Sequence, residues 1–336
     1  MTNPRLAAVF YGVNNFIQTP EALRYAQENA TPGLTSFTVV DNGSDPPYSS
    51  FEWSKSANVV RYEKNIGGNA VFHRWMKDAW FGRYGAPLYT MGSDDPKSLR
   101  PGNPIFPEFI GFFHCDLYIR EKGWDQKLVN AFDQYPKLAL QGFVGSNQID
   151  ERGGRGSGTM LNYLGAFYEG IGQASRAEQH GRRVTSLHAA AVLDHCALVF
   201  RTSDLVTLTP QEGNFAPEHF YDRHLCCEVL SKGRWIAVNG ISCDHFSGGL
   251  GGGVPNAAEL CREFLNARGI SYAKDQERHQ TYIESEKDFH KKFLDTGFIP
   301  LRVDGAQNVI HEHVARGGFW FPGWNPGLGR TRRDGR

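Results

Sequence analysis

The sequence lacks several features that would assign it at once to a class of protein. Its 36 lysines and arginines are balanced by 36 aspartates and glutamates, so no net charge attracts nucleic acid or an acidic membrane, although local patches remain possible. Its six cysteines include no CxxC pair, which disfavours a disulfide framework or a zinc ribbon and favours reduced thiols in a cytoplasmic protein. No apolar run approaches the roughly 18 residues of a membrane helix, and the apolar run near the first residue is too short for a signal peptide. We therefore expect a protein that is soluble, or peripheral to a membrane at most.

The chain does contain enough apolar sequence to bury a large core. Of its 336 residues, 40% are hydrophobic and 13% aromatic, which suffices for one large domain with an appendage or for two modest domains. The first third alternates short β-rich segments with segments of helical periodicity, and this order predicts a parallel sheet whose ligands bind at the carboxyl ends of the strands. The expected strands are residues 6–11, 37–40, 59–62, 109–113 and 236–243, and the expected helices are residues 19–29, with Thr19 as N-cap, 69–81 and 222–231.

Ionisable residues stand where two of these strands end. Asp41 follows strand 37–40, and His114-Cys115-Asp116 follows strand 109–113. A buried strand can end on an aspartate without leaving its charge unsolvated where the strand end opens into a ligand crevice. We therefore expect Asp116 to lie at the centre of a site.

Five motifs together resemble the inverting GT-A glycosyltransferases of family 2, in particular the subgroup with HDD, HFYD and HxSxG motifs. The motifs are VVDNGSD at 39–45, NIGG at 65–68, HCD at 114–116, HFYDRHLCCEVLSKGRW at 219–235 and DHFSGG at 244–249. Their order and spacing agree with that family over about residues 5–300. The resemblance implies an α/β, GT-A fold in which helices flank a mainly parallel central sheet. It implies a transferase domain in residues 1–255, a helical extension in 256–316 and an aromatic, basic tail in 317–336.

The resemblance also implies a nucleotide-sugar donor, with a UDP-linked hexose as the expected one. Tyr11 would flank the base, Asp41 would accept a hydrogen bond from the base or ribose, and Asn65 and Gly67 would approach the donor closely. Two plainer interpretations stay open: residues 41–44 could be an ordinary turn or a glycosylation sequon, and residues 65–68 a simple strand-to-helix turn.

A divalent metal, Mn²⁺ or Mg²⁺, is expected to assist departure of the diphosphate. In the resemblance Asp116 is the metal-binding aspartate and His245 completes the metal or diphosphate site. Cys115 stands where the family has a second carboxylate, which leaves the metal affinity open, and His245 could instead be a solvated loop residue. Asp94-Asp95 looks like a second metal motif, but its proline-rich surroundings predict a surface insertion.

Asp222 is the general base that the resemblance implies, because an inverting transferase must remove the proton of the acceptor hydroxyl. It lies in the first turn of a predicted helix, where the helix dipole favours a carboxylate, so it could also serve only as a cap. His224 replaces the second acid of the family motif and could contact the acceptor or simply pack. If Asp222 is not the base, Glu218 and Asp244 are the next candidates.

The sequence therefore predicts an inverting glycosyltransferase that moves a hexose to a hydroxyl acceptor such as a glycan. The aromatic, basic tail of residues 317–336 keeps a hydroxymethylated DNA base open as an alternative acceptor. The departure at Cys115 keeps open a GT-A-like binding module without catalytic activity. Residues 248–254 could form a lid over the diphosphate or a plain linker, and a zinc site built from Cys226, Cys227, Cys243 and His245 is disfavoured by its spacing.

Overall fold

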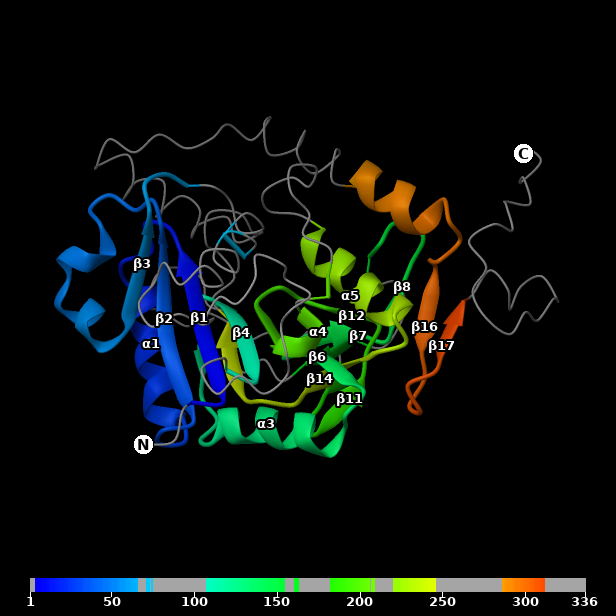
Figure 1. The fold of residues 1–336 in the computed structure, drawn as a ribbon, viewed down its shortest axis with the longest axis horizontal. Helices are drawn as coiled ribbons and strands as arrows, with labels where there is room; N and C mark the ends of the chain where they lie inside the picture. Colours follow the sequence, from blue (N-terminus) through cyan, green and yellow to red (C-terminus); the bar gives the residue numbers. More distant parts are fainter. Residues whose placement is uncertain are drawn as a thin grey trace, which may run out of the picture.

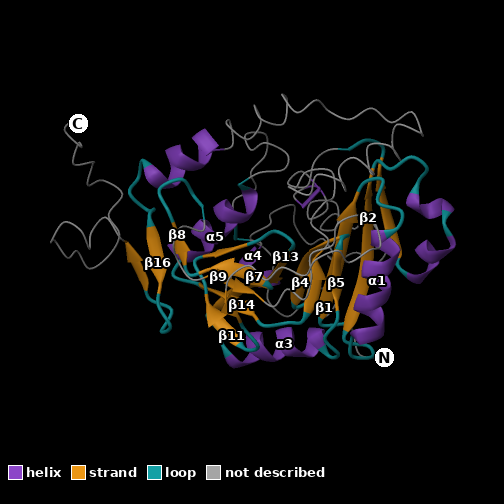
Figure 2. Ribbon diagram, turned by 180° about the vertical axis from the view of Figure 1, so that it is seen from behind, coloured by secondary structure: helices purple, strands orange, loops and turns teal. Residues whose placement is uncertain are grey.

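A central mixed sheet of eight strands organises the computed structural model, which describes residues 4–65, 71–72, 74, 107–154, 160–162, 182–205, 207–208, 220–245 and 286–311. The strand order is β11-β14-β6-β13-β4-β1-β2-β3 (Figures 1 and 2). Four of the seven neighbouring pairs are parallel, so the predicted α/β class with a mainly parallel central sheet is confirmed. The strands are β1 (Leu6–Gly12), β2 (Thr35–Asn42), β3 (Asn58–Tyr62), β4 (Phe109–His114), β6 (Leu138–Gly142), β11 (Leu187–Ala189), β13 (Ala197–Arg201) and β14 (Trp235–Asn239).

Both faces of this sheet are buried, which explains why its strands read as nearly continuous apolar runs. Alternate residues of β1 point to opposite faces. Leu6, Ala8 and Phe10 join one hydrophobic cluster, whereas Ala7 and Val9 join the other. The sheet is therefore covered on both sides, and its polar residues can reach a ligand only at the strand ends.

Helices α1 (Gln18–Asn29) and α3 (Trp124–Gln134) cover one face, and α5 (Tyr221–Ser231) covers the other (Figures 1 and 2). Trp124, Leu128 and Phe132 recur every four residues and form the buried stripe of α3. The indole of Trp124 donates a 3.0 Å hydrogen bond to the Ala26 carbonyl, which ties α3 to α1.

Helix α1 begins one residue before the predicted N-cap. Its N-cap is Ile17, and Thr19 lies inside the helix, buried, with its hydroxyl 3.3 Å from the Tyr48 hydroxyl. The capping interaction comes from Asn15, whose side-chain oxygen accepts a 3.1 Å hydrogen bond from the Gln18 amide. The prediction of Thr19 as N-cap was wrong because Asn15 caps the helix from further upstream.

The predicted strand 236–243 is two strands with different partners. Strand β14 belongs to the central sheet, and β15 (Cys243–His245) pairs antiparallel with β5 (Leu117–Ile119) in a separate ladder. The chain leaves the central sheet between the two, at Gly240 and Ile241. This change of sheet carries His245 toward the residues that follow β4.

Two smaller sheets and short helical segments complete the described residues. Within the predicted helical extension, residues 256–316, the structure shows a helical turn followed by two strands, one of which pairs with β8. Both predicted boundaries of the extension lie outside the described residues. One sheet has the order β10 (Arg182–Arg183), β9 (Met160–Asn162), β7 (Val144–Ser146), β12 (Val192–Leu193), and the other β17 (Val309–His311), β16 (Leu301–Val303), β8 (Gln148–Ile149). The helical segments are α4 (Thr202–Leu205) and the turns Tyr48–Ser50, Glu52–Ser56 and His290–Leu294.

No helix within the described ranges combines the length and the apolar character that crossing a membrane requires.

The turn after β2 depends on a glycine, and its replacement is expected to destabilise the protein. Gly43 has a φ of +83°, and a Cβ there would lie 2.5 Å from the Asn65 backbone nitrogen. Gly33 is the matched control, because its φ is +76° and a Cβ would meet nothing within 4 Å. We expect Gly33→Ala to lower the free energy of unfolding by about 1 kcal/mol, the cost of the left-handed backbone alone. Gly43→Ala should lower it by about 3 kcal/mol because the steric clash adds to that cost.

Urea unfolding monitored by circular dichroism measures both changes. Equal losses in the two variants would show that the Gly43 turn yields to a side chain without cost.

Candidate functional site

The carboxyl ends of β1, β2 and β4 bring the predicted donor-site residues to one edge of the sheet. Tyr11 and His114 are register partners across β1 and β4, and Gly12 is the partner of Asp41 across β1 and β2. Strand β13 runs antiparallel to β4, so the residues that precede it lie at the same edge. The amide of His114 donates a 3.0 Å hydrogen bond to the Cys196 carbonyl and fixes this neighbour.

The β5–β15 ladder adds the second half of the cluster. His245 is the register partner of Leu117, the residue after Asp116, so the imidazole and the carboxylate meet. His245 Nε2 lies 3.3 Å from Asp116 Oδ1, and His114 Nδ1 lies 3.7 Å from the same oxygen. Potential ligand atoms of His114, Asp116 and His245 all lie within 4.8 Å of one another. The structure therefore brings together both sequence-predicted metal ligands and adds His114 to them.

The charges of this cluster are coupled. Burial disfavours the charged form of His245, but the adjacent Asp116 carboxylate outweighs burial and raises the pKa of His245. Burial likewise opposes ionisation of Asp116, yet His245 keeps the pKa of this carboxyl below its usual value. Burial, together with the neighbouring His195, lowers the pKa of His114 to about 3, so this ring is neutral. A neutral imidazole, a carboxylate and a second imidazole whose proton a cation can replace form a suitable ligand set for a metal.

Two buried atoms of the cluster are suited to a metal ion. Asp116 Oδ1 and His245 Nε2 are buried and lie 3.3 Å from each other, and among the described residues neither atom forms a hydrogen bond of good geometry. Ligands about 2 Å from one ion lie at most about 4 Å apart, so small side-chain rotations suffice to close the cluster around an ion. Two imidazoles with one carboxylate favour a transition metal such as Mn²⁺ over Mg²⁺, which prefers oxygen ligands alone.

Cys115 does not belong to this cluster, although it sits between two of its members in sequence. The side-chain amide of Asn15 donates from Nδ2 to Cys115 Sγ at 3.3 Å, and a Cβ on Gly12 would lie 2.5 Å from the same sulfur. The Cys115 sulfur therefore packs against Asn15 and the end of β1, while His114 and Asp116 face the site. The residue that stands in place of a family carboxylate is thus turned away from the other ligand atoms.

Asp222 lies next to the cluster, separated from it by His195. Its Oδ2 is 3.5 Å from His195 Nδ1, and the His195 and His114 ring centroids are 4.5 Å apart. The Asp222 side chain is 9% exposed, and its other oxygen accepts a 2.8 Å hydrogen bond from the Arg223 amide. Burial opposes ionisation of Asp222, but the nearby His195 keeps the pKa of its carboxyl below the usual value. Asp222 is therefore an ionised carboxylate in the first turn of α5, as the sequence predicts.

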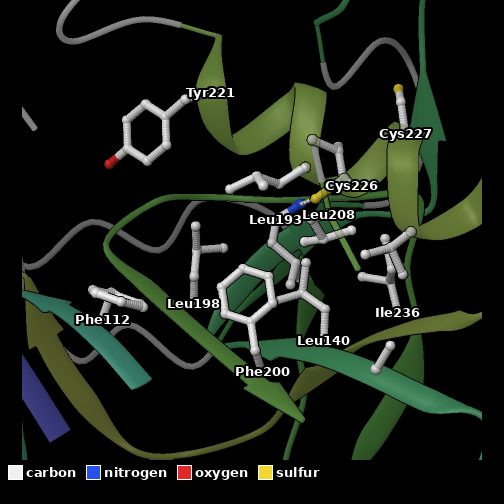
Figure 3. Close-up of a cluster of buried hydrophobic side chains, with 14 of the residues drawn as sticks. Phe112, Leu140, Leu193, Leu198, Phe200, Leu208, Tyr221, Cys226, Cys227 and Ile236 are labelled. Carbon is white, nitrogen blue, oxygen red and sulfur yellow. Dashed lines mark hydrogen bonds between the residues drawn. The ribbon is translucent and has the colours of Figure 1, made fainter. Parts of the chain in front are cut away.

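A pair of tyrosines links the start of α5 to the end of β1. The hydroxyls of Tyr11 and Tyr221 are 2.8 Å apart, and the rings of Tyr11 and His114 meet nearly at right angles with a centroid distance of 5.4 Å. Figure 3 shows the Tyr221 ring extending away from α5 with its hydroxyl at the far end. Burial raises the pKa of both hydroxyls, so both remain neutral hydrogen-bonding groups.

Asp41 is completely buried and its carboxylate has partners within the protein. It accepts hydrogen bonds from the amides of Ser44 at 2.7 Å and Tyr48 at 2.9 Å, and Arg61 pairs with it at 2.6 Å. Asn42 donates a 2.8 Å hydrogen bond to the side chain of Asn65, which joins the two predicted donor-binding turns. Contact of Asp41 and Asn65 with a nucleotide stays a prediction, and in this structure Asp41 holds the turn of residues 41–48 together.

Several predicted features lie outside the described residues. They are Gly67, Asp94, Asp95, Glu218, residues 248–254 and residues 317–336. Asp244, a second candidate for the base, is described and faces away from the cluster, since Arg120 pairs with it at 2.6 Å.

Sequence reasoning assigned no role to His114 or His195. The one signal for His114 is its place in the HCD motif, two residues before Asp116 at the end of β4. No comparable signal marks His195, which reaches the site only because β13 runs antiparallel to β4.

Comparison with known proteins gives loose structural likeness and no match in sequence. No family model matches the chain, and no curated protein matches it. The chain is similar to the mannosyltransferase PcManGT from Pyrobaculum calidifontis in complex with GDP-Man and Mn²⁺, at 13% identity and a TM-score of 0.44, covering 81% of this chain and 66% of that one. It is also similar to GalNAc-T7 with UDP, GalNAc and Mn²⁺, at 10% identity and a TM-score of 0.47, covering 85% of this chain and 55% of that one.

Proposed function

We propose that this protein is a GT-A glycosyltransferase that moves a hexose from a nucleotide sugar to a hydroxyl acceptor with inversion. The proposed donor is UDP-linked, and the proposed acceptor is a glycan or another hydroxyl compound. The observation that carries the proposal is the convergence of His114, Asp116 and His245 with the ionised Asp222 at the carboxyl edge of the sheet. A ligand cluster for a cation next to a buried carboxylate base is what this chemistry requires.

His114, Asp116 and His245 would hold the divalent cation. When bound, the cation neutralises the charge that grows on the diphosphate as the sugar leaves. These residues come from β4, the turn after it and β15, so the metal site depends on the central sheet and on the β5–β15 ladder together.

Asp222 would take the proton of the acceptor hydroxyl. As the acceptor oxygen bonds to the anomeric carbon, the bond from that carbon to the phosphate oxygen breaks and its electron pair leaves with the nucleoside diphosphate. The acceptor proton passes to Asp222 Oδ2, the oxygen on the side of His195 and the cluster, whereas Oδ1 accepts the Arg223 amide. Attack opposite the leaving group inverts the anomeric centre.

The experiment that tests the proposal is a screen of donor turnover. The purified protein with Mn²⁺ is offered UDP-glucose, UDP-galactose, UDP-N-acetylglucosamine and GDP-mannose, and release of the nucleoside diphosphate is measured. We expect release from one UDP-sugar above the others, stimulated by acceptors of one class. Nuclear magnetic resonance of the product should show the opposite anomeric configuration to that of the donor.

Other outcomes separate the alternatives. Nucleotide binding without any turnover would support a binding module without catalytic activity, and retained configuration would contradict inversion. Turnover stimulated by hydroxymethylated DNA would support the acceptor that residues 317–336 suggest, which lies outside the described residues.

A further inference from the structure

We infer that His195 is a positioning residue, which donates from Nδ1 to Asp222 and holds the base at a fixed place relative to the metal ligands. The inference rests on the proposed function, in which Asp222 is the general base. It adds a residue for which the sequence provides no role. The observation behind it is the contact of one imidazole with the base on one side and a cluster ligand on the other.

The Asp222 carboxylate needs two contacts to fix its plane, and the structure supplies both. The Arg223 amide donates to Oδ1 at 2.8 Å, and His195 Nδ1 lies 3.5 Å from Oδ2. Rotation about the last side-chain bond of an aspartate is soft, so the backbone contact alone leaves the second oxygen free to swing. The His195 contact restrains the oxygen that would receive the proton.

His195 itself is held by two neighbouring rings. The Tyr221 ring stacks on it at 5.4 Å with an interplanar angle of 16°, and His114 lies at 4.5 Å. The backbone beside it is fixed as well, because the Cys196 carbonyl accepts from the His114 amide and the Cys196 amide donates to Asp194 at 2.9 Å. An imidazole restrained in this way can hold one element at a fixed distance from another.

The elements that His195 connects are the ones that the reaction must align. Asp222 belongs to α5, whereas His114 ends β4 and Asp116 follows it. Misplacement of a reacting group by about 1 Å can cost about 10² in rate. A link between helix and sheet at this point therefore protects the distance between the base and the metal-bound donor.

The test compares three variants that distinguish the contribution of the aromatic ring from the contributions of the two ring nitrogens. His195→Asn places an amide donor near the position of Nδ1 without the ring, and His195→Gln places one near Nε2. His195→Phe keeps the stacked ring and has no donor. The readouts are kcat of transfer, KM of the acceptor, the Kd of Mn²⁺ by calorimetry, and crystal structures of the metal-free variants.

We expect His195→Phe and His195→Gln to lower kcat by about 10- to 100-fold while KM and the Mn²⁺ Kd change less than about threefold. His195→Asn should keep kcat within about fivefold of the original enzyme. In the variant Asp222→Asn, adding His195→Phe should cost almost nothing further, because His195 acts only through Asp222. The crystal structures should show the Asp222 carboxylate turned away in His195→Phe and retained in His195→Asn.

Three results would overturn the inference. The first is a kcat for His195→Asn as low as that for His195→Phe, which would indicate proton transfer by the imidazole. The second is a full additive loss of kcat when His195→Phe is added to Asp222→Asn, and the third is an unmoved Asp222 carboxylate in the His195→Phe crystal structure. If the original enzyme transfers no sugar, the proposed function fails, and the crystal structures still decide whether His195 positions Asp222.

Discussion

Replacing Asp116 with asparagine is expected to lower kcat of sugar transfer by on the order of 10³ and to remove measurable Mn²⁺ binding by calorimetry. The physical reason is the loss of the only carboxylate among the three clustered ligands, His114, Asp116 and His245. Charge stabilisation by a bound cation amounts to several kcal/mol in a transition state, and each 1.36 kcal/mol corresponds to about tenfold in rate. Asparagine keeps the size of the side chain, so the fold should be retained, while loss of the ion pair with His245 should lower the thermal midpoint of unfolding.

Asp244→Asn is the matched control for this prediction. Asp244 is adjacent to His245 in β15 but pairs with Arg120 at 2.6 Å on the other side of the strand. This variant should bind Mn²⁺ as the original protein does.

A second comparison replaces Asp94 and Asp95 together with alanine. Loss of Mn²⁺ binding in that variant, with binding retained in Asp116→Asn, would move the metal site to residues 94–95.

Replacing Asp222 with asparagine should lower kcat of transfer by on the order of 10² to 10⁴ while leaving donor and Mn²⁺ affinity close to the original values. Asparagine keeps the shape of the side chain and can still accept the Arg223 amide, but it cannot take a proton at neutral pH. Binding and chemistry should therefore separate in this variant. Steady-state kinetics gives kcat, and calorimetry with UDP and Mn²⁺ gives the affinities.

Glu228→Gln on the same helix is the control for disturbance of α5. Glu228 lies further along α5 and pairs with Lys232 at 3.1 Å. The Glu228→Gln variant should transfer sugar at nearly the original rate. If Asp222→Asn also transfers normally, Asp222 is not the base, and Glu218 or Asp244 becomes the candidate. If Asp222→Asn loses UDP binding, its role is to hold the helix or the donor in place.

The fold class could be predicted from the sequence because it follows from local patterns. Short apolar runs that alternate with amphipathic segments predict strands buried on both faces, and β1, β2, β3 and β4 lie where these runs occur. The placement of Asp116 and Asp222 also followed from local order, since one comes just after a strand and the other begins a helix. These properties depend on neighbours in sequence.

The extra strand boundary near the site could not be predicted in the same way. Residues 236–243 read as one apolar segment, yet β14 and β15 pair with different strands, because β5 offers an edge that residues Cys243–His245 can join. Strand pairing is decided by which edges are open in three dimensions, and sequence periodicity carries no information about that choice.

The sequence by itself therefore determined the α/β class, the strand and helix that carry the site, and the identity of Asp116, His245 and Asp222 as candidate residues. Only the tertiary structure decided that His114 joins the cluster, that Cys115 turns away from it, and that His195 stands between the cluster and Asp222. Each of these facts depends on side chains from strands distant in sequence that meet at one edge. Which residues meet there follows from strand direction and register, both of which are set by packing of the whole sheet.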